Sequence, residues 1–545
     1  MLTLRTSALA ISSLAAAVSC TTLANYLPAS AIATEPDGSW VGGYYSSWSY
    51  WAGKPGTKDL SMIKDTAGAA NYITYAFLGV TTQKTLTDHL PLYGGKFLTD
   101  QQQGKPGTVV DTEALVESGV TSCPEYPEDF SACVNSYATK YMSKYAASTN
   151  GKTILLASIG GWSYTDRLNQ FYQDYTSDPA VLTRFVDSTR NWLKGHPAFS
   201  GISIDWEYPG YGHSASHDGH QGEGKLYTAM MMKLRIMLNN LGGENNKHYY
   251  LTTAVVASPK KAKGEAEEGV DWQKVASSAD WLDLMGFDMH GEFDVVSGMK
   301  GLAQNMSEST ELQSAIDFYI KKAHVPARKI VLGGPTYARE MLVAQQPTEK
   351  NRFGYMGSLR YKGFEKYGQA FKKAYYTDNP DYFKFADNPN PEPYYPAAGM
   401  VDFTGTYSYS CFLDTLTKGA APSQCGFLVK RDNRGAIGQP IPKGLKLSYP
   451  EPNIAWLSDN KQSVKATFAG APNPSQPYPA YPVFTLDTQK VVRDKANKLV
   501  KANKLGGMWF WELSQDALQS PKYALFTQAC KSIGHNGMCL TEKNQ

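Results

Sequence analysis

The sequence lacks an excess of charge of either sign. Its 545 residues include 53 Lys and Arg against 50 Asp and Glu, for a net charge of +3 at pH 7. This balance offers no strong basic field to hold a polyphosphate chain, so nucleic acid is not an expected partner. Charged residues make up 19% and hydrophobic residues 42% of the chain. A mainly disordered protein is therefore excluded, because disorder combines high net charge with low hydrophobicity.

Long apolar runs are also missing. A weakly apolar stretch follows Arg5, from Ser7 to Val18, and it is too short and too rich in small residues to span a bilayer. We expect residues 1–33 to be a signal peptide, cleaved after Ala33, and the protein to be secreted. A lipid anchor at Cys20 and a retained N-terminal segment are the alternatives. No other stretch is a membrane-span candidate, so no membrane is expected as a partner.

Cysteine is scarce, with seven residues. Besides Cys20, the others lie in three pairs that are close in sequence: Cys123 and Cys133, Cys411 and Cys425, and Cys530 and Cys539. No pair has C-x-x-C spacing and no His cluster lies beside them, so neither a zinc site nor any other metal or cofactor is expected. Three local disulfides are the natural interpretation for an exported protein, and six free thiols in a cytosolic protein are the alternative.

Aromatic residues and glycine are plentiful. The chain has 35 Tyr, 11 Trp, 48 Gly and 30 Pro, which favours long irregular loops that carry flat aromatic faces, as sugar-binding proteins do. Trp162, Trp48 and Trp51 are candidates to stack on sugar rings, with core packing as the alternative. The length also exceeds the roughly 250 to 300 residues that one hydrophobic core accommodates, so at least two domains are expected.

Strand and helix signals alternate along the chain. Eight short apolar runs predict strands: Val41 to Tyr45, Tyr72 to Val80, Thr153 to Ile159, Gly201 to Trp206, Tyr249 to Ala257, Trp281 to Phe287, Lys329 to Gly333 and Gly507 to Trp511. Helical periodicity follows several of them, at Ala180 to Leu193, Lys225 to Leu238, Leu312 to Lys322 and Thr488 to Leu505. Eight βα units predict an α/β fold, a closed (β/α)8 TIM barrel with its chemistry at the C-terminal strand ends.

Two segments are too long to be simple loops of this barrel. The catalytic barrel with strands one to seven is expected over residues 34–339, with a loop insertion at about 81–149. Residues 340–480, rich in Tyr, Pro and Gly, predict an α+β domain inserted between strands seven and eight. Residues 481–545 then supply the last helix, strand eight and a C-terminal segment. The sequence shows no internal repeat and no low-complexity linker.

The sharpest candidate site is the stretch from Phe199 to Pro209. Side chains alternate faces along a strand, so Ser203, Asp205 and Glu207 share one face, which would be the barrel interior. Carboxyl groups two residues apart have Cα atoms roughly 6.6 Å apart, so their charges interact in a low-dielectric pocket and one pKa should rise. A protonated carboxyl beside an ionised one is typical of acid catalysis on a leaving oxygen.

This stretch resembles the D-G-x-D-x-D-x-E signature of family-18 glycoside hydrolases, the chitinases, in their bacterial form. Other strand ends agree: Ser158 to Trp162 resembles the S-x-G-G motif, Met285 to Asp288 the M-x-Y-D motif, Pro335 to Arg339 the P-x-Y-G-R motif, and Trp511 to Leu513 the W-E-L motif. The resemblance extends from about Trp40 to Asp516. It implies a retaining chitinase that hydrolyses β-1,4-linked N-acetylglucosamine polymers with the substrate's own N-acetyl oxygen as nucleophile.

The resemblance also implies roles for individual residues. Glu207 would be the general acid and later the base, Asp205 would position the acetamido group, and Asp288 would complete the catalytic set. Asp288 as a partner of an arginine such as Arg339 is the alternative. The residues implied in substrate binding are Gly160, Gly161, Trp162, Ser203, Tyr208, Met285, Phe287, Tyr337, Arg339 and Trp511, with Trp511 as the floor of the subsite.

The sequence departs from the family pattern at four positions. Ser200 and Ser203 replace the first and second Asp of the signature, Phe287 replaces a Tyr, and Ala338 replaces a Gly. Ser203 leaves Asp205 with one negative neighbour fewer, so Glu207 is expected to be its chief coupled group. Phe287 lacks a hydroxyl for the acetamido carbonyl, which should reduce the rate without abolishing it, so a working enzyme is expected.

Two other functions fit the same signature. One is an endo-β-N-acetylglucosaminidase that acts on glycoprotein glycans. The other is a weakly active chitinase-like carbohydrate-binding subunit, alone or in a larger assembly. The expected ligand in each case is chitin, a chitooligosaccharide or a related glycan. His213, His217 and His220 follow the acid in a Gly/Ser-rich loop, where a solvated loop explains them without a metal.

Overall fold

The structure is a computed structural model. It describes residues 40–47, 70–82, 106–111, 142–145, 147, 153–210, 220, 222–288, 311–343, 400–410, 445–447, 454–457, 464–466, 478–516 and 523–534. The expected signal peptide, Trp48, Trp51, His213, His217 and every cysteine except Cys530 lie outside these residues. Within them, no helix is both long and apolar enough to cross a bilayer.

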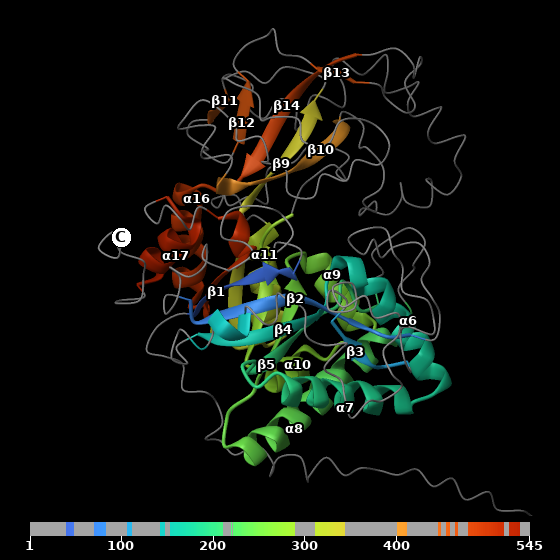
Figure 1. Ribbon diagram of the computed structural model, residues 1–545. Coiled ribbons are helices and arrows are strands. Elements are labelled where there is room, and N and C mark those ends of the chain that lie inside the picture. The colour runs from blue at the N-terminus through green and yellow to red at the C-terminus, as the bar shows by residue number, and fades with distance from the viewer. Residues whose placement is uncertain are drawn as a thin grey trace, which may run out of the picture. The chain divides into compact units, whose positions relative to one another are not determined.

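Eight parallel strands form a closed barrel (Figure 1). They are β1 (Trp40–Ser46), β2 (Tyr72–Val80), β4 (Ile154–Gly160), β5 (Gly201–Asp205), β6 (Tyr250–Val256), β7 (Trp281–Met285), β8 (Ile330–Pro335) and β15 (Gly507–Trp511). Each pairs with the next, and β15 pairs with β1 to close the ring. All eight predicted strands are present, so the predicted (β/α)8 barrel is confirmed.

Helices follow the strands in the predicted order. They include α6 (Thr165–Ser177), α7 (Ala180–Gly195), α8 (Glu223–Asn245), α9 (Pro259–Glu267), α10 (Trp272–Ser278), α11 (Glu311–Asp317), α16 (Gln489–Lys495) and α17 (Leu525–Ile533). Side-chain caps begin three of them. Ser258, Asp271 and Thr488 each accept a hydrogen bond from the backbone N–H three residues on, which satisfies a donor that has no partner within the helix.

Two apolar layers stabilise the barrel. An outer layer fills the space between strands and helices, and it includes Val41, Tyr45 and Ile73 on the outward faces of β1 and β2. The inner layer is largely aromatic, with Trp40, Tyr44, Tyr72, Trp281 and Trp509 among its buried members. The alternation of outward and inward residues along each strand places these two sets on opposite faces. The barrel interior is therefore a packed, low-dielectric core.

A bulge in β2 alters the alternation near the barrel mouth. The pairing of β2 with β4 shifts register between Ala76 and Leu78, so that Ala76 and Phe77 both belong to the inner layer. A bulge re-aims one side chain of a strand without ending the pairing. Phe77 thereby reaches the inner face close to the end of the strand.

A second sheet lies between β8 and β15 in the chain. It has six antiparallel strands in the order β10, β9, β14, β12, β11, with β13 paired to β14. Their bounds are β9 (Tyr337–Val343), β10 (Met400–Ser408), β11 (Leu445–Leu447), β12 (Ile454–Leu457), β13 (Val464–Ala466) and β14 (Tyr478–Leu486). The expected boundaries at 339/340 and 480/481 fall within β9 and β14, and the division into domains stays a prediction. In the expected 81–149 insertion, β3 (Val109–Val110) pairs antiparallel with β2.

Candidate active site

The carboxyl end of β5 places Asp205 inside the barrel. Asp205 is the last residue of the strand and is 4% exposed, while Ser203 two residues earlier is fully buried. The Ser203 hydroxyl lies 3.1 Å from the hydroxyl of Tyr44 on β1. Because Tyr44 belongs to the inner aromatic layer, this contact sets Ser203 on the interior face. Asp205 shares that face by the two-residue period of the strand.

Glu207 lies just beyond the strand, half-buried, and its backbone is held by α6. The Glu207 N–H donates to the Thr165 hydroxyl at 3.0 Å, and that hydroxyl donates to the Gly161 carbonyl at 3.1 Å. The Trp206 indole donates to Asn169 of the same helix at 2.8 Å. Sequence reasoning missed Thr165 and Asn169, since both act through a helix that follows a different strand.

Gly160 and Gly161 allow β4 to approach β5 closely. The Gly161 N–H donates to the Asp205 carbonyl at 2.6 Å. A Cβ on Gly160, whose φ is +114°, would lie 2.1 Å from that carbonyl oxygen, and a Cβ on Gly161 would overlap the Phe77 ring. Only glycine fits these two positions. The two glycines therefore fix the backbone beneath Asp205.

Aromatic rings gather at the strand ends around this pair. Trp511, at the end of β15, stacks on Phe77 with ring centroids 5.5 Å apart and an interplanar angle of 19°. The ring centroids of Tyr44 and Trp511 are 5.5 Å apart. Trp162, in the 3-10 turn after β4, is 38% exposed. Trp511 thus lies at the carboxyl end of a barrel strand, and Trp162 is the more accessible of the two.

The ends of β7 and β8 bring three further predicted residues together. The Tyr337 hydroxyl donates to Asp288 at 2.6 Å, and Phe287 packs edge-on against Trp509 and Tyr337. Met285 is buried in the inner layer. Asp288 therefore has a tyrosine as a hydrogen-bond partner, while the side chain of Arg339 lies outside the described residues. Tyr208 packs against both layers and has the Lys261 ammonium 4.9 Å from its ring centre.

Asp283, in the middle of β7, is an interior acid that sequence reasoning missed. It is fully buried, and its Oδ1 accepts from the Tyr72 hydroxyl at 2.8 Å and the Trp281 indole at 3.1 Å. Burial raises its pKa to about 7. Burial and then the charge of Asp283 raise the pKa of Asp205. Asp283 is thus a charged neighbour of Asp205, and the expected coupling of Asp205 with Glu207 stays a prediction. A lone Asp within the apolar run Trp281 to Met285 was the available signal.

The protein should lose stability as the pH rises from about 4 to about 7. Burial raises the pKa of Asp283 and of Glu223 to about 7 and that of Asp205 above its ordinary range, whereas these carboxyls titrate near 4 in the unfolded chain. Within this window the folded state binds more protons, so the free energy of unfolding falls with pH. We expect a decrease on the order of a few kcal/mol, since one pKa unit corresponds to about 1.4 kcal/mol.

Thermal unfolding followed by circular dichroism between pH 4 and 7 measures this effect. Asp280 does not offset this decrease in the free energy of unfolding. Its pKa is lowered in the folded protein, so the stability that it contributes is lost only below about pH 4. Asp283→Asn removes one of the three groups and should make the slope shallower. A midpoint temperature that is constant or rises across this range would contradict the prediction.

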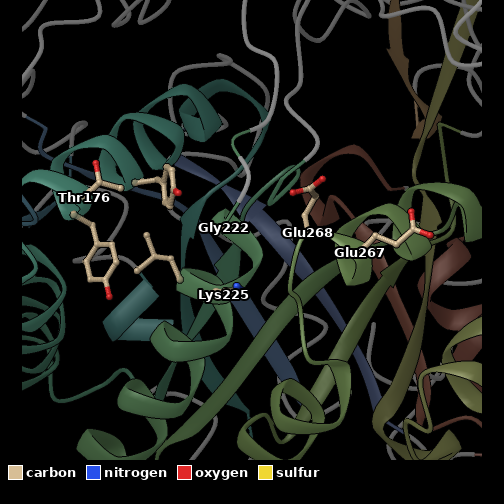
Figure 2. Close-up of a pocket in the computed structure, with 8 residues that line it drawn as sticks. Thr176, Gly222, Lys225, Glu267 and Glu268 are labelled. Atoms are coloured by element: carbon tan, nitrogen blue, oxygen red, sulfur yellow. The ribbon is translucent and has the colours of Figure 1, made fainter. Parts of the chain in front are cut away.

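A pocket of about 630 Å³ lies on the outer side of the barrel (Figure 2). It is lined by Tyr172, Tyr175, Thr176, Gly222, Lys225, Leu226, Glu267 and Glu268. These residues belong to α6, to α8 and its N-cap, and to the C-terminal end of α9 with the residue after it, and none is a predicted site residue. Tyr172 stacks on His220 with ring centroids 5.8 Å apart. The convergent carboxyl groups and aromatic rings at the strand ends, and not this pocket, therefore define the candidate active site.

These features define a (β/α)8 barrel whose chemical groups meet at the carboxyl ends of the strands, with two carboxyl groups at the end of β5. The chain belongs to the glycosyl hydrolases family 18, whose family model matches residues 41–516. The family resemblance read from the strand-end motifs is thus confirmed.

Similar proteins carry chitinase names. Chitinase A1 of Niallia circulans is 26% identical over 331 residues, which are 57% of this chain and 44% of that protein. Chitotriosidase-1 of Mus musculus is 28% identical over 201 residues, 36% of this chain and 40% of that protein. The chain thus spans about half the length of such relatives or less. Chitinase ChiA74 from Bacillus thuringiensis has a similar fold, with a TM-score of 0.58 at 20% identity, covering 91% of this chain and 70% of that chain.

Proposed function

We propose that this protein is a chitinase that hydrolyses β-1,4-linked N-acetylglucosamine polymers with retention of configuration. The observation that carries the proposal is the pair Asp205 and Glu207 at the end of β5 in a family-18 barrel. Relatives with chitinase names support it. So does a protein of similar fold, a family-18 chitinase from Cycas revoluta, which binds (GlcNAc)4 as a double mutant.

The first half-reaction uses both acids. The Glu207 carboxyl donates its proton to the glycosidic oxygen, and the bond from that oxygen to the anomeric carbon breaks. The acetamido oxygen of the same sugar attacks the anomeric carbon and forms a cyclic oxazolinium ion. Asp205, as a carboxylate, accepts a hydrogen bond from the acetamido N–H, so its negative charge stabilises the positive charge that develops on the amide.

The second half-reaction returns the enzyme to its starting state. The Glu207 carboxylate removes a proton from a water molecule, whose oxygen attacks the anomeric carbon from the face that the leaving group vacated. The ring opens, the acetamide is restored and Glu207 is protonated again. Two displacements at one carbon give net retention. Because the nucleophile is part of the substrate, no separate group has to be brought to the carbon.

The barrel interior supplies the environment that this chemistry needs. The stacked rings of Phe77 and Trp511 offer a flat apolar floor for a sugar ring. The half-buried position of Glu207 leaves its carboxyl reachable from the mouth, while Asp205 is almost fully buried. Asp288 and Tyr337, hydrogen-bonded to each other, offer polar groups on the opposite side of the mouth.

Hydrolysis of a fluorogenic chitobioside tests the activity, and the anomer formed first tests the mechanism. Products trapped at early times should be β-anomers, and a thiazoline analogue of the cyclised intermediate should inhibit. Mainly α-anomeric product would mean inversion and would overturn the substrate-assisted mechanism.

Release of sugar from colloidal chitin, compared with release from a high-mannose glycoprotein, separates a chitinase from an endo-β-N-acetylglucosaminidase. Sugar binding with no release from either would indicate a carbohydrate-binding subunit.

Phe287→Tyr is expected to raise kcat. Phe287 lies beside Tyr337 and Trp509 at the end of β7, and a hydroxyl on its ring would donate to the acetamido carbonyl. One neutral hydrogen bond contributes about 0.5 to 1.5 kcal/mol, which corresponds to roughly a 2- to 12-fold increase. Steady-state kinetics on the fluorogenic chitobioside measure it. A kcat that is unchanged or lower would show that position 287 does not face the acetamido group.

We also propose that the protein is secreted after removal of residues 1–33 and that its six remaining cysteines form three local disulfides. Cys530 is fully buried on α17, and the other five lie outside the described residues. Mass spectrometry of unreduced peptides from exported protein should show the pairs Cys123–Cys133, Cys411–Cys425 and Cys530–Cys539. Three or more free thiols would refute this pairing.

A further inference from the structure

Asp283 lies on the same line across the sheet as Asp205. In the pairing of β5 with β6, Ile204 is opposite Thr253, so the next position on each strand places Ala254 beside Asp205. In the pairing of β6 with β7, Ala254 is opposite Asp283. Asp283 is therefore two strands away from Asp205, roughly 10 Å between backbones, and the side chain between them is a single methyl group.

Both acids have one oxygen in the interior without a partner. Oδ1 of Asp205 and Oδ2 of Asp283 are buried and have no hydrogen-bond partner among the described residues. The other oxygen of Asp283 accepts from both Tyr72 and Trp281. Two donors on one carboxyl oxygen fix the orientation of the group and favour its ionised form.

The surroundings of this pair contain no compensating positive charge in the described part of the interior. Among the described residues, the titratable groups that interact with the two acids are the acids themselves and four tyrosines: Tyr44 from β1, Tyr72 from β2, Tyr208 after β5 and Tyr227 from α8. The charges of Asp205 and Asp283 both raise the pKa of Tyr44, so the Tyr44 hydroxyl lies within electrostatic reach of both acids. Two carboxylates in such a site cannot both ionise freely, so one proton is retained by the pair.

Ser203 carries no charge and occupies the position next to Asp205 on the same interior face of β5. We propose that Asp283 is a positioning residue for Asp205: it acts from β7 as the second interior carboxyl, and its negative charge controls when Asp205 gives up its proton and becomes the carboxylate that faces the substrate's amide. This inference rests on the proposed function, because the acetamide mechanism requires Asp205 as a carboxylate. Asp283 itself need not touch the substrate.

The pH profile of kcat/KM for the fluorogenic chitobioside tests the proposal in the full chain. Asp283→Asn is isosteric and keeps an acceptor for Tyr72 and Trp281, but it removes the negative neighbour of Asp205. The acid limb should therefore move down by about one pH unit, and kcat at pH values below the wild-type limb should rise without a matching change in KM. The double variant Asp283→Asn with Ser203→Asp returns a carboxyl to the interior beside Asp205. It should move the acid limb back up toward its wild-type position.

Asp280→Asn is the matched control, because it makes the same chemical change just before β7. Asp280 pairs with Arg235 and His248, so this variant should lose stability while its acid limb stays in place. An acid limb that is the same in Asp283→Asn and in wild type would overturn the proposal. So would a double variant that unfolds at the wild-type temperature but keeps the acid limb of Asp283→Asn.

A second measurement does not depend on turnover. In protein labelled with ¹³C at the Asp side-chain carboxyls, NMR titration should show raised midpoints in wild type for Asp205, Asp283 and Asp487. Asp283→Asn should remove its own signal, lower the midpoint of Asp205 and leave that of Asp487 in place. If hydrolysis is absent but this result is obtained, the proposed function fails while the pairing of Asp205 with Asp283 stands. If the Asp205 midpoint is unchanged, the pairing itself is wrong.

Discussion

Glu207→Gln is expected to lower kcat on a fluorogenic chitobioside by about 10²- to 10⁴-fold, because a general acid contributes about that much to proton transfer. The amide has the size of the carboxyl but cannot donate a proton to the leaving oxygen and then accept one from water. The backbone contacts that hold residue 207, to Thr165 on α6, do not involve its side chain. The fold and the affinity for chitooligosaccharides should therefore be kept.

Isothermal titration with a chitooligosaccharide and thermal unfolding check that the loss is chemical. Glu267→Gln is a matched control, since Glu267 is an exposed carboxyl on α9 that pairs with Lys263. It should retain wild-type turnover. A Glu207→Gln variant that keeps a tenth of the wild-type kcat would sink the assignment of Glu207 as the acid.

Gly160→Ala is expected to damage both stability and activity. The added methyl would lie 2.1 Å from the carbonyl oxygen of Asp205, and the backbone φ of +114° is one that alanine rarely adopts. The obstacle is backbone, which has no alternative rotamer, so β4 and β5 must separate. We expect a loss of about 3 kcal/mol or more in the free energy of unfolding. The displacement of Asp205 should reduce kcat by about 10²-fold, since a shift of about 1 Å can cost that much.

Chemical denaturation and steady-state kinetics measure these two effects. Gly243→Ala makes the same change at an exposed position in α8, where nothing lies within 4 Å of the new methyl. It should raise stability by about 0.5 to 1 kcal/mol, because alanine favours a helix interior over glycine. A Gly160→Ala protein with wild-type denaturation and turnover would show that β4 does not approach Asp205 as closely as described.

The local pattern of apolar and polar residues in the sequence was sufficient to predict much of the fold of this protein. Apolar runs of strand length and helical periodicity predicted the eight strands and four of the helices, because burial imposes a composition that can be read along the chain; α6, α9, α10 and α17 were not predicted. The period of two along β5 placed Ser203 and Asp205 on one face, and the structure has both inside the barrel. The motifs at the strand ends predicted the family, and the family model confirms it.

Contacts between distant strands needed the tertiary structure. Closure of the barrel decides which residue of β7 lies level with Asp205, and the sequence between these strands carries no signal of that lateral register. Asp283 was missed for this reason, as was Thr165, which holds the backbone of Glu207 from a helix after β4. The bulge in β2 that turns Phe77 toward Trp511 is also a property of strand pairing. The sequence by itself thus determined the elements, their inward faces and the two acids of β5. Only the closed barrel decided which third carboxyl shares their low-dielectric interior.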